Sequence, residues 1–301
     1  MDNKYKKKNR IYGVIVIAVL AVLLFMISTK EGGGTWFDNS KRIAVLPLEG
    51  EINTSRKWVS SLQKFAENDR IGGILIPINS PGGQVAPSQE LYHAIRTVRD
   101  NSDKPIFVSM ASVAASGGYY AALGADSIFA NDGTLTGSIG VIMQFPIYSD
   151  LMEKVGVGMR TVKSQEFKDA GSPFREMNEQ EQVYFQGIIN DVYEQFTEVV
   201  SHERGIDEIN MQSLGNGRVF TGRQAFKVNL VDALGTFEDA RIALCKKAGI
   251  PLNSKLQYPL EPRRSWWTIL KDDVSSALPG WESSSSIKLQ YRIPYYQRRL
   301  A

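Results

Sequence analysis

The hydrophobic positions of this chain fall into two patterns that alternate along the sequence. The apolar runs at 43–48 and 74–78 are nearly continuous, which is typical of strands buried on both faces of a parallel sheet. The segment 55–68 and the stretch after Pro87 carry apolar residues at helical spacing instead. This order of strand, helix, strand and helix predicts an α/β domain with right-handed crossovers.

The alternation continues through the middle of the chain. Further strands are expected at 106–110 and 127–130, and a long amphipathic helix is expected from Asn178 to about Glu203. The segment 132–140 is so rich in glycine and threonine that it predicts an irregular loop.

The N-terminus has a different character. Residues 1–10 carry five Lys or Arg side chains against one acid, and residues 11–28 form an 18-residue run without a charge. Such a run is about as long as the shortest helix that spans a bilayer. A cleaved signal peptide is the competing interpretation, but its apolar segment is usually only about 7–15 residues long.

We therefore expect an uncleaved transmembrane signal anchor at 11–28. The basic flank at 1–10 should stay in the cytoplasm, which places the rest of the chain on the periplasmic or extracellular side of the inner (cytoplasmic) membrane. A linker at 29–40 then leads to a folded domain at 41–250, and 251–301 is a tail of unknown role.

Composition excludes several classes of function. A net charge of +3 is too small to indicate nucleic-acid binding, and the clearest basic run is the N-terminal one. Cys245 is the single cysteine, and the two histidines, His93 and His202, are far apart in the sequence. No zinc-type Cys/His spacing exists, so the sequence predicts neither a metal nor a cofactor, and His93 is read as a surface or packing residue.

The strongest candidate for chemistry is Ser116, which stands between an apolar strand and a run of small residues. Gly117 and Gly118 follow it and would let another chain approach the backbone closely. The simpler interpretation is that Ser116 caps a buried helix. A hydrolase would also need a base, and with histidine poorly placed the remaining solution is a buried lysine. The residues alone do not choose between Lys163 and Lys168.

Five motifs occur in one order and resemble those of the short form of signal peptide peptidase A (SppA), a membrane-anchored serine protease family of the ClpP/crotonase superfold, built from repeated ββα units. The likeness covers roughly Ile43 to Gly249. The motifs are Asn79-Ser80-Pro81-Gly82-Gly83, Ala115-Ser116-Gly117-Gly118-Tyr119, Thr136-Gly137-Ser138-Ile139-Gly140, Lys163 to Lys168 with Ser172-Pro173-Phe174-Arg175, and Gly217-Arg218-Val219-Phe220-Thr221-Gly222.

The resemblance implies a role for each matched residue. Ser116 would be the nucleophile and Lys168 the general base, with Ser138 holding the lysine amine in place. The backbone N–H groups of Gly83 and Gly117 would form the oxyanion hole. The family's short form assembles as a homo-oligomeric ring in which neighbouring subunits share each active site, and its substrates are remnant signal peptides and other apolar peptides.

The chain departs from the family pattern at two places. Gln165 and Glu166 stand where the family shows a glycine, and we expect the Glu166 side chain to point outward. Asn229 also replaces a glycine, and asparagine is the next best residue for a left-handed backbone.

Other functions fit the same residues less well. An acyl-CoA hydratase or thioesterase-like enzyme of this superfold would seldom need an anchor. A non-catalytic membrane scaffold would differ from a protease only in whether Ser116 and Lys168 work together. A protease for stomatin-type membrane proteins would share the chemistry. The tail from Trp266 to Tyr296 is hypothesised to dock on a neighbouring subunit or to occupy its own active-site groove.

Overall fold

The computed structural model describes residues 17, 19–20, 40–259 and 289–292. The chain divides into two units, 1–40 and 41–301, and the fold below is that of the second. Apart from three positions, the apolar run 11–28 lies outside the described residues. None of the helices in the described part of the chain is long and apolar enough to cross a membrane.

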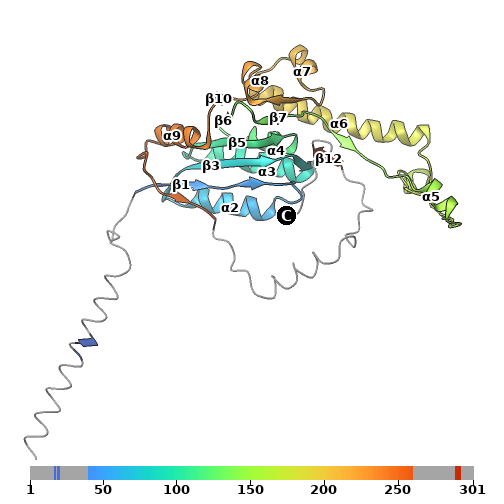
Figure 1. Ribbon diagram of the computed structural model, residues 1–301, viewed down its shortest axis with the longest axis horizontal. Coiled ribbons are helices and arrows are strands. Elements are labelled where there is room, and N and C mark those ends of the chain that lie inside the picture. The colour runs from blue at the N-terminus through green and yellow to red at the C-terminus, as the bar shows by residue number, and fades with distance from the viewer. Residues whose placement is uncertain (1–16, 18, 21–39, 260–288, 293–301) are drawn as a thin grey trace, which may run out of the picture. The chain divides into compact units, whose positions relative to one another are not determined.

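A parallel sheet forms the centre of the domain (Figure 1), with strand order β10-β6-β5-β3-β1-β11. Its two central strands are the longest and most completely buried, as their continuous apolar runs predict. The strands of this path are β1 (Arg42–Val45), β3 (Ile71–Ser80), β5 (Ile106–Ala115), β6 (Ser127–Ala130), β10 (Ala233–Leu234) and β11 (Leu256–Gln257).

Three short strands extend this sheet at the ends of β3 and β5. β2 (Leu48–Glu49) pairs in parallel with the end of β3, and β7 (Leu135–Gly137) pairs in parallel with the end of β5. β9 (Val219–Thr221) then pairs antiparallel with β7. The loop expected at 132–140 is therefore wrong in part, because three of its residues form β7.

Helices cover both faces of the sheet. Leu75 and Phe107 point to one face, where they pack with Leu244 of α9 (Phe237–Ala248). Ile74 and Ile76 point to the other face and join the main core, because successive side chains of a strand alternate. The helices that contribute to that core are α2 (Arg56–Glu67), α3 (Val85–Asn101), α4 (Gly117–Ala122), α6 (Glu179–Arg204), α7 (Glu208–Leu214) and α8 (Gly222–Lys227).

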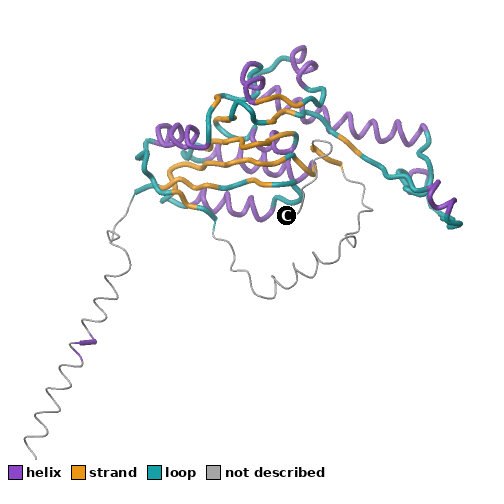
Figure 2. The backbone as a smooth tube through the Cα atoms, viewed as in Figure 1, coloured by secondary structure: helices purple, strands orange, loops and turns teal. Residues whose placement is uncertain are grey.

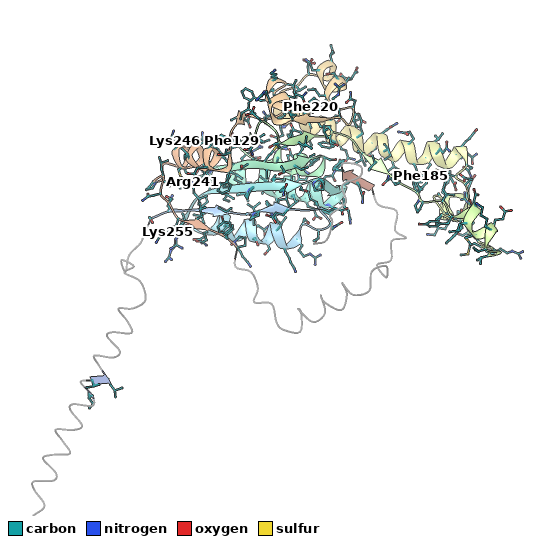
Figure 3. All side chains as sticks on the ribbon, viewed as in Figure 1. Phe129, Phe185, Phe220, Arg241, Lys246 and Lys255 are labelled. Atoms are coloured by element: carbon teal, nitrogen blue, oxygen red, sulfur yellow. The ribbon has the colours of Figure 1, made fainter. Side chains whose placement is uncertain are left out.

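The long helix α6 carries an arm at its N-terminal end. The arm contains α5 (Ser149–Lys154) and the short 3₁₀ helix η1 (Glu166–Asp169), and in Figure 1 it lies beyond the end of α6, away from α4. Phe185 of α6 stacks against Phe145 with ring centroids 4.5 Å apart, which fastens the arm to the helix (Figure 3). The start of α6 is fixed by a capping box between Asn178 and Glu181.

A second, antiparallel sheet lies at the ends of the central strands. Its order is β4-β12-β8, formed by β4 (Gly82–Gln84), β12 (Leu289–Arg292) and β8 (Ile142–Met143). The middle strand comes from the C-terminal tail, so the last described segment of the chain is built into the fold (Figure 2). The rest of the range 266–296 lies outside the described residues.

Two further expectations are confirmed by the backbone. Asn229 adopts a φ of 61°, the left-handed conformation for which asparagine is suited after glycine. The Asn178 helix runs over 26 residues and ends at Gly205, which has a φ of 61°.

Candidate active site

Ser116 lies at the junction between β5 and α4. Its side chain is 1% exposed, and its backbone has φ 53° and ψ −116°. A residue with a Cβ rarely adopts such a positive φ, and positions of this kind cluster at functional sites. The Ser116 N–H donates to the Gly137 carbonyl at 2.7 Å. Its buried Oγ, in contrast, has no hydrogen-bond partner among the described residues.

A second buried serine stands beside the first. Ala115 of β5 pairs in register with Gly137 of β7, so Ser116 and Ser138 are the next residues on two neighbouring strands. Ser138 is 5% exposed and also has a positive φ, 50°, and its N–H donates to the Arg218 carbonyl at 2.9 Å. The strand pairing thus brings together two serine residues that are 22 residues apart in the sequence.

Glycine backbone lines the space next to Ser116. A side-chain carbon added to Gly83 would lie 2.2 Å from the Ile52 carbonyl oxygen, and one added to Gly117 would lie 2.4 Å from Ser88 Oγ and 3.2 Å from Gly83 N. Both positions therefore exclude a side chain, and the two backbone N–H groups stand close together.

Strand β12 runs along this glycine wall. Tyr291 pairs with Gly83 and Arg292 with Gly82 in the antiparallel register. A side-chain carbon on Gly82 would meet the Tyr291 carbonyl oxygen at 2.0 Å and Gly117 N at 2.7 Å. The extended strand β12 thus fills the gap between β4 and β8, which we call the groove, and its Tyr291 carbonyl oxygen lies close to the glycine backbone.

The two candidate lysines differ in their contacts. Lys163 Nζ donates to Asp169 Oδ1 at 2.6 Å and to the Glu166 carbonyl at 2.9 Å. Lys168 is exposed on η1, and its amine forms no hydrogen bond or ion pair with the described residues. A general base must have a site that accepts a proton, so an amine whose protons are donated to a carboxylate is poorly suited to that task.

A single chain does not bring Lys168 to Ser116. Phe167, next to Lys168, packs against Tyr184 of α6 with tilted rings, whereas Tyr120 of α4 packs edge-to-face against Phe196 of the same helix. Because an α-helix rises 1.5 Å per residue, these two contacts lie about 18 Å apart along α6. That separation is well beyond the reach of a lysine side chain.

Family profiles match most of the folded domain. The profile of peptidase family S49 matches residues 99–250, half of the chain, and that of Clp protease matches residues 37–128. The chain belongs to peptidase family S49. Together with the mixed α/β sheet, the Clp protease match shows a ClpP/crotonase-like fold for this S49 peptidase.

Individual relatives agree with this S49 assignment. A candidate protease of Synechocystis sp. is 39% identical over 70% of this chain and 76% of its own length, and one of Methanocaldococcus jannaschii is 30% identical over 83% and 85%. A candidate signal peptide peptidase SppA of Enterococcus faecium is 36% identical over 67% of this chain and 59% of its own length. This S49 peptidase is thus a serine protease similar to SppA.

The structure brings four of the five predicted site residues together, and their roles stay a prediction. Ser116, Ser138, Gly83 and Gly117 lie together, as expected from their matched motifs, and Lys168 lies apart on the arm. Two parts of the site were missed. They are the ion-pair cluster that holds the arm and the aromatic side chains of Tyr120 and Phe196 that pack against Tyr291 of β12. Neither has a local sequence signal, because the members come from distant segments.

The ion-pair cluster joins the lysine-bearing turn to the start of α6. Arg175 donates to both carboxylate oxygens of Glu181, which is 1% exposed, and to the carboxylate and carbonyl of Asp169. Hydrogen bonds from Arg175 and Lys163 lower the pKa of Asp169 to about 2, and the bond from Arg175 lowers the pKa of Glu181. The turn that carries Lys168 is thereby attached to a fixed point of the fold.

Proposed function

We propose that this chain is a membrane-anchored endopeptidase with a Ser–Lys dyad divided between two copies of the chain. Ser116 is the nucleophile, and Lys168 of a neighbouring copy is the base. One observation carries the proposal: Ser116 Oγ is buried without a hydrogen-bond partner among the described residues, close to where β12 pairs with β4, while Lys168 stands on an arm too far away to reach it.

The reaction follows from the positions of these groups. Ser116 Oγ attacks the substrate carbonyl carbon while the neutral Lys168 amine accepts the hydroxyl proton. The oxyanion accepts hydrogen bonds from the N–H groups of Gly83 and Gly117. As the C–N bond breaks, the lysine gives the proton to the leaving amine, and water then hydrolyses the acyl-enzyme by the same route. The Ser138 hydroxyl orients the amine without charging it.

The exposed surface of the arm supports the proposal that a second copy of the chain completes the active site. Val162 is 94% exposed and Val155 63% exposed, and neighbouring apolar side chains are exposed as well. These further residues are Ile147, Tyr148, Leu151, Val157 and Met159. Large exposed apolar patches mark protein interfaces, so we assign this one to the contact that places Lys168 in the neighbouring active site of a homo-oligomer.

The substrate class follows from the groove and the N-terminus. An extended peptide that adds as a strand to β4 forms backbone hydrogen bonds along the groove. The apolar run 11–28 would hold the enzyme at a membrane. Remnant signal peptides and other apolar segments released there are the proposed substrates.

The first test is labelling with a fluorophosphonate. The full chain in detergent is treated with the probe and digested, and mass spectrometry locates the adduct, which we expect at Ser116. The same preparation should cut a synthetic signal peptide. A chain that assembles but is neither labelled nor active would favour a non-catalytic scaffold instead.

Removal of strand β12 should increase activity on added peptides. A chain ending at residue 288 is expected to cleave a signal peptide about 10-fold faster at low substrate concentration, because a tethered strand no longer competes for the groove. Initial rates against substrate concentration measure the effect, with Tyr258→Ala, an exposed change in the tail well before β12, as the control. Equal rates for the shortened and full chains would contradict it.

Loss of the Arg175 cluster should reduce turnover more than binding. Arg175→Ala is expected to lower kcat about 10- to 100-fold with little change in KM, because the turn with Lys168 loses its fixed position. Arg175→Lys should fall between, since an ammonium does not make the two-pronged contact of a guanidinium. Steady-state kinetics measure the effect, with Arg223→Ala as the control because it removes only an exposed ion pair with Asp132. An unchanged kcat for Arg175→Ala would contradict the prediction.

A further inference from the structure

The end of the domain at which β1 begins carries a concentration of positive charge. The segments 41–48 and 240–259 together contain six Lys or Arg residues and no Asp or Glu. Figure 3 labels three of these cations, Arg241, Lys246 and Lys255, and they lie at the same end of the domain. Cations gathered in this way produce a positive potential over the surface.

Contacts in the fold bring the two segments together. The Ile43 N–H donates to the Lys255 carbonyl at 3.1 Å, so Lys255 lies beside the start of β1. A side-chain carbon added to Gly72 would lie 3.0 Å from the Ile250 side chain and 3.1 Å from that of Lys41. The first residue of the domain and the residues just after α9 therefore meet at one place.

Most of this charge is not neutralised within the fold. Arg241 is paired with Glu238 at 2.6 Å, whereas Lys41, Lys246 and Lys247 are exposed and form no ion pair with the described residues. Two lysines in the last turn of a helix are common, because the helix dipole favours positive charge there. The dipole of α9 does not account for a further lysine at the start of β1, so a partner outside the fold is the better explanation of the cluster.

An acid at the same end of the sheet has cations of its own. Asp69 is followed by Arg70, and both are exposed. Burial lowers the pKa of Lys104, Asp69 opposes that shift, and the charge of Lys41 adds to it. Asp69 therefore acts on Lys104 as well, and the net charge of this end stays positive.

The chain enters the domain at this end. Lys41 is the first residue of the unit 41–301, and the 12 residues 29–40 separate it from the apolar run 11–28. An extended chain of that length spans at most about 40 Å. A membrane that holds the apolar run is therefore always within reach of the basic end, and attraction to lipid headgroups becomes effective once they approach within about 10 Å.

We propose that this basic end, formed by Lys41, Lys246, Lys247 and Lys255, docks on the anionic phospholipid headgroups of the membrane. The inference rests on the anchor in the proposed function and does not depend on the peptidase chemistry. Leu252 is exposed in the connection between α9 and β11. An apolar side chain beside lysines suits the boundary between headgroups and acyl chains.

Docking at this end determines where the active site stands. Ser116 directly follows β5, a strand of 10 residues that begins at the basic end, and such a strand is about 33 Å long. The proposed nucleophile is then held at the side of the domain that faces away from the lipid. Peptides that have left the bilayer reach it, whereas segments that still span the bilayer do not.

The strength of docking follows from the number of lysines. Each lysine close to an anionic surface strengthens binding by about 5-fold. Removal of three lysines should therefore shift the docking equilibrium by a factor on the order of 100.

Lysine acetylation of the full chain in lipid nanodiscs tests this. One set of discs contains phosphatidylcholine alone, and in the other set part of it is replaced by phosphatidylglycerol. After a short pulse of acetic anhydride, mass spectrometry gives the rate at each lysine. We expect the four lysines to react at least about 5-fold more slowly in the anionic discs at low salt, and added salt should remove the difference. The exposed Lys57 of α2 and Lys227 of α8 should react equally in both.

The decisive variant combines Lys246→Gln, Lys247→Gln and Lys255→Gln, with the acetylation rate of Lys41 as the readout. We expect Lys41 to lose its protection in the anionic discs. The matched control combines Lys57→Gln, Arg223→Gln and Lys227→Gln, which removes the same charge from exposed helix positions and should keep the protection.

Thermal melting confirms that the variants are folded, and Lys247→Gln alone serves if the triple variant is not. The inference is overturned by equal acetylation of the four lysines in both kinds of disc, or by protection of Lys41 that survives in a folded variant. Either result leaves the proposed peptidase untouched. A chain that does not stay in the discs overturns the anchor in the proposed function, and docking with it.

Discussion

Replacing Ser116 with alanine is expected to lower peptide hydrolysis by about four to six orders of magnitude in kcat, the loss typical of a removed serine nucleophile. The substitution deletes the one buried hydroxyl that the groove presents without a hydrogen-bond partner among the described residues. Because that oxygen makes no hydrogen bond to the described residues, the free energy of unfolding should hardly change. The measurement is kcat on a fluorogenic signal peptide, together with thermal melting of the same preparation.

Ser109 provides a matched control on the same strand. It is 4% exposed on β5, before the site, and Ser109→Ala should keep activity within about 3-fold of the wild type, as expected for a small change away from the site. Substantial activity in a folded Ser116→Ala variant would mean that another group attacks the peptide, and the dyad would have to be abandoned.

Lys168→Ala should be as inactive as Ser116→Ala, whereas Lys163→Ala should retain most of its activity. Lys163 is bonded to Asp169 and to a backbone carbonyl, so its loss removes a support of the turn rather than the base. The same peptide assay compares the two variants. If Lys163→Ala is inactive and Lys168→Ala still cuts the peptide, the general base is Lys163 and not Lys168.

The division of the site between copies has a stronger test. Chains with Ser116→Ala and chains with Lys168→Ala, each inactive alone, are co-expressed with different tags and purified through both. At equal amounts, a random homo-oligomer should regain about a quarter of the wild-type activity, because half of the serines are intact and half of those face an intact lysine.

A site confined to one chain predicts a different result. No chain in that mixture carries both residues, so no activity would return. Recovery therefore distinguishes a shared site from an internal one, without knowledge of the number of subunits. Co-expression of two Ser116→Ala chains gives the background.

Much of this fold could be predicted because local patterns and the global structure agree. The runs at 74–78 and 106–110 are buried strands, and the 178–181 spacing is a capping box. Asn229 tolerates the left-handed backbone that its position demands. Around the site, Gly83 is required by the close approach of the Ile52 backbone and Gly117 by that of the Ser88 hydroxyl, and such constraints leave a visible trace in a sequence.

The rest depended on contacts between distant segments. β7 is three residues long and exists because β5 and β9 pair with it on either side. β12 lies in a tail of weak periodicity, where the partner strands rather than its own pattern fix the register. The difference between Lys163 and Lys168 arises from the path of one turn past Asp169, which spacing alone does not encode.

If the proposed function holds, the pairing of strand β12 with β4 also sets the peptide concentration at which cleavage becomes efficient. A strand joined to its own groove through the segment 260–288 is present at an effective concentration on the order of millimolar, and it stays there however dilute the protein is. Under the proposed function, a free peptide would be cut efficiently only when it competes successfully with this attached strand. The tail would then act as a threshold that spares scarce peptides and lets accumulated ones be degraded.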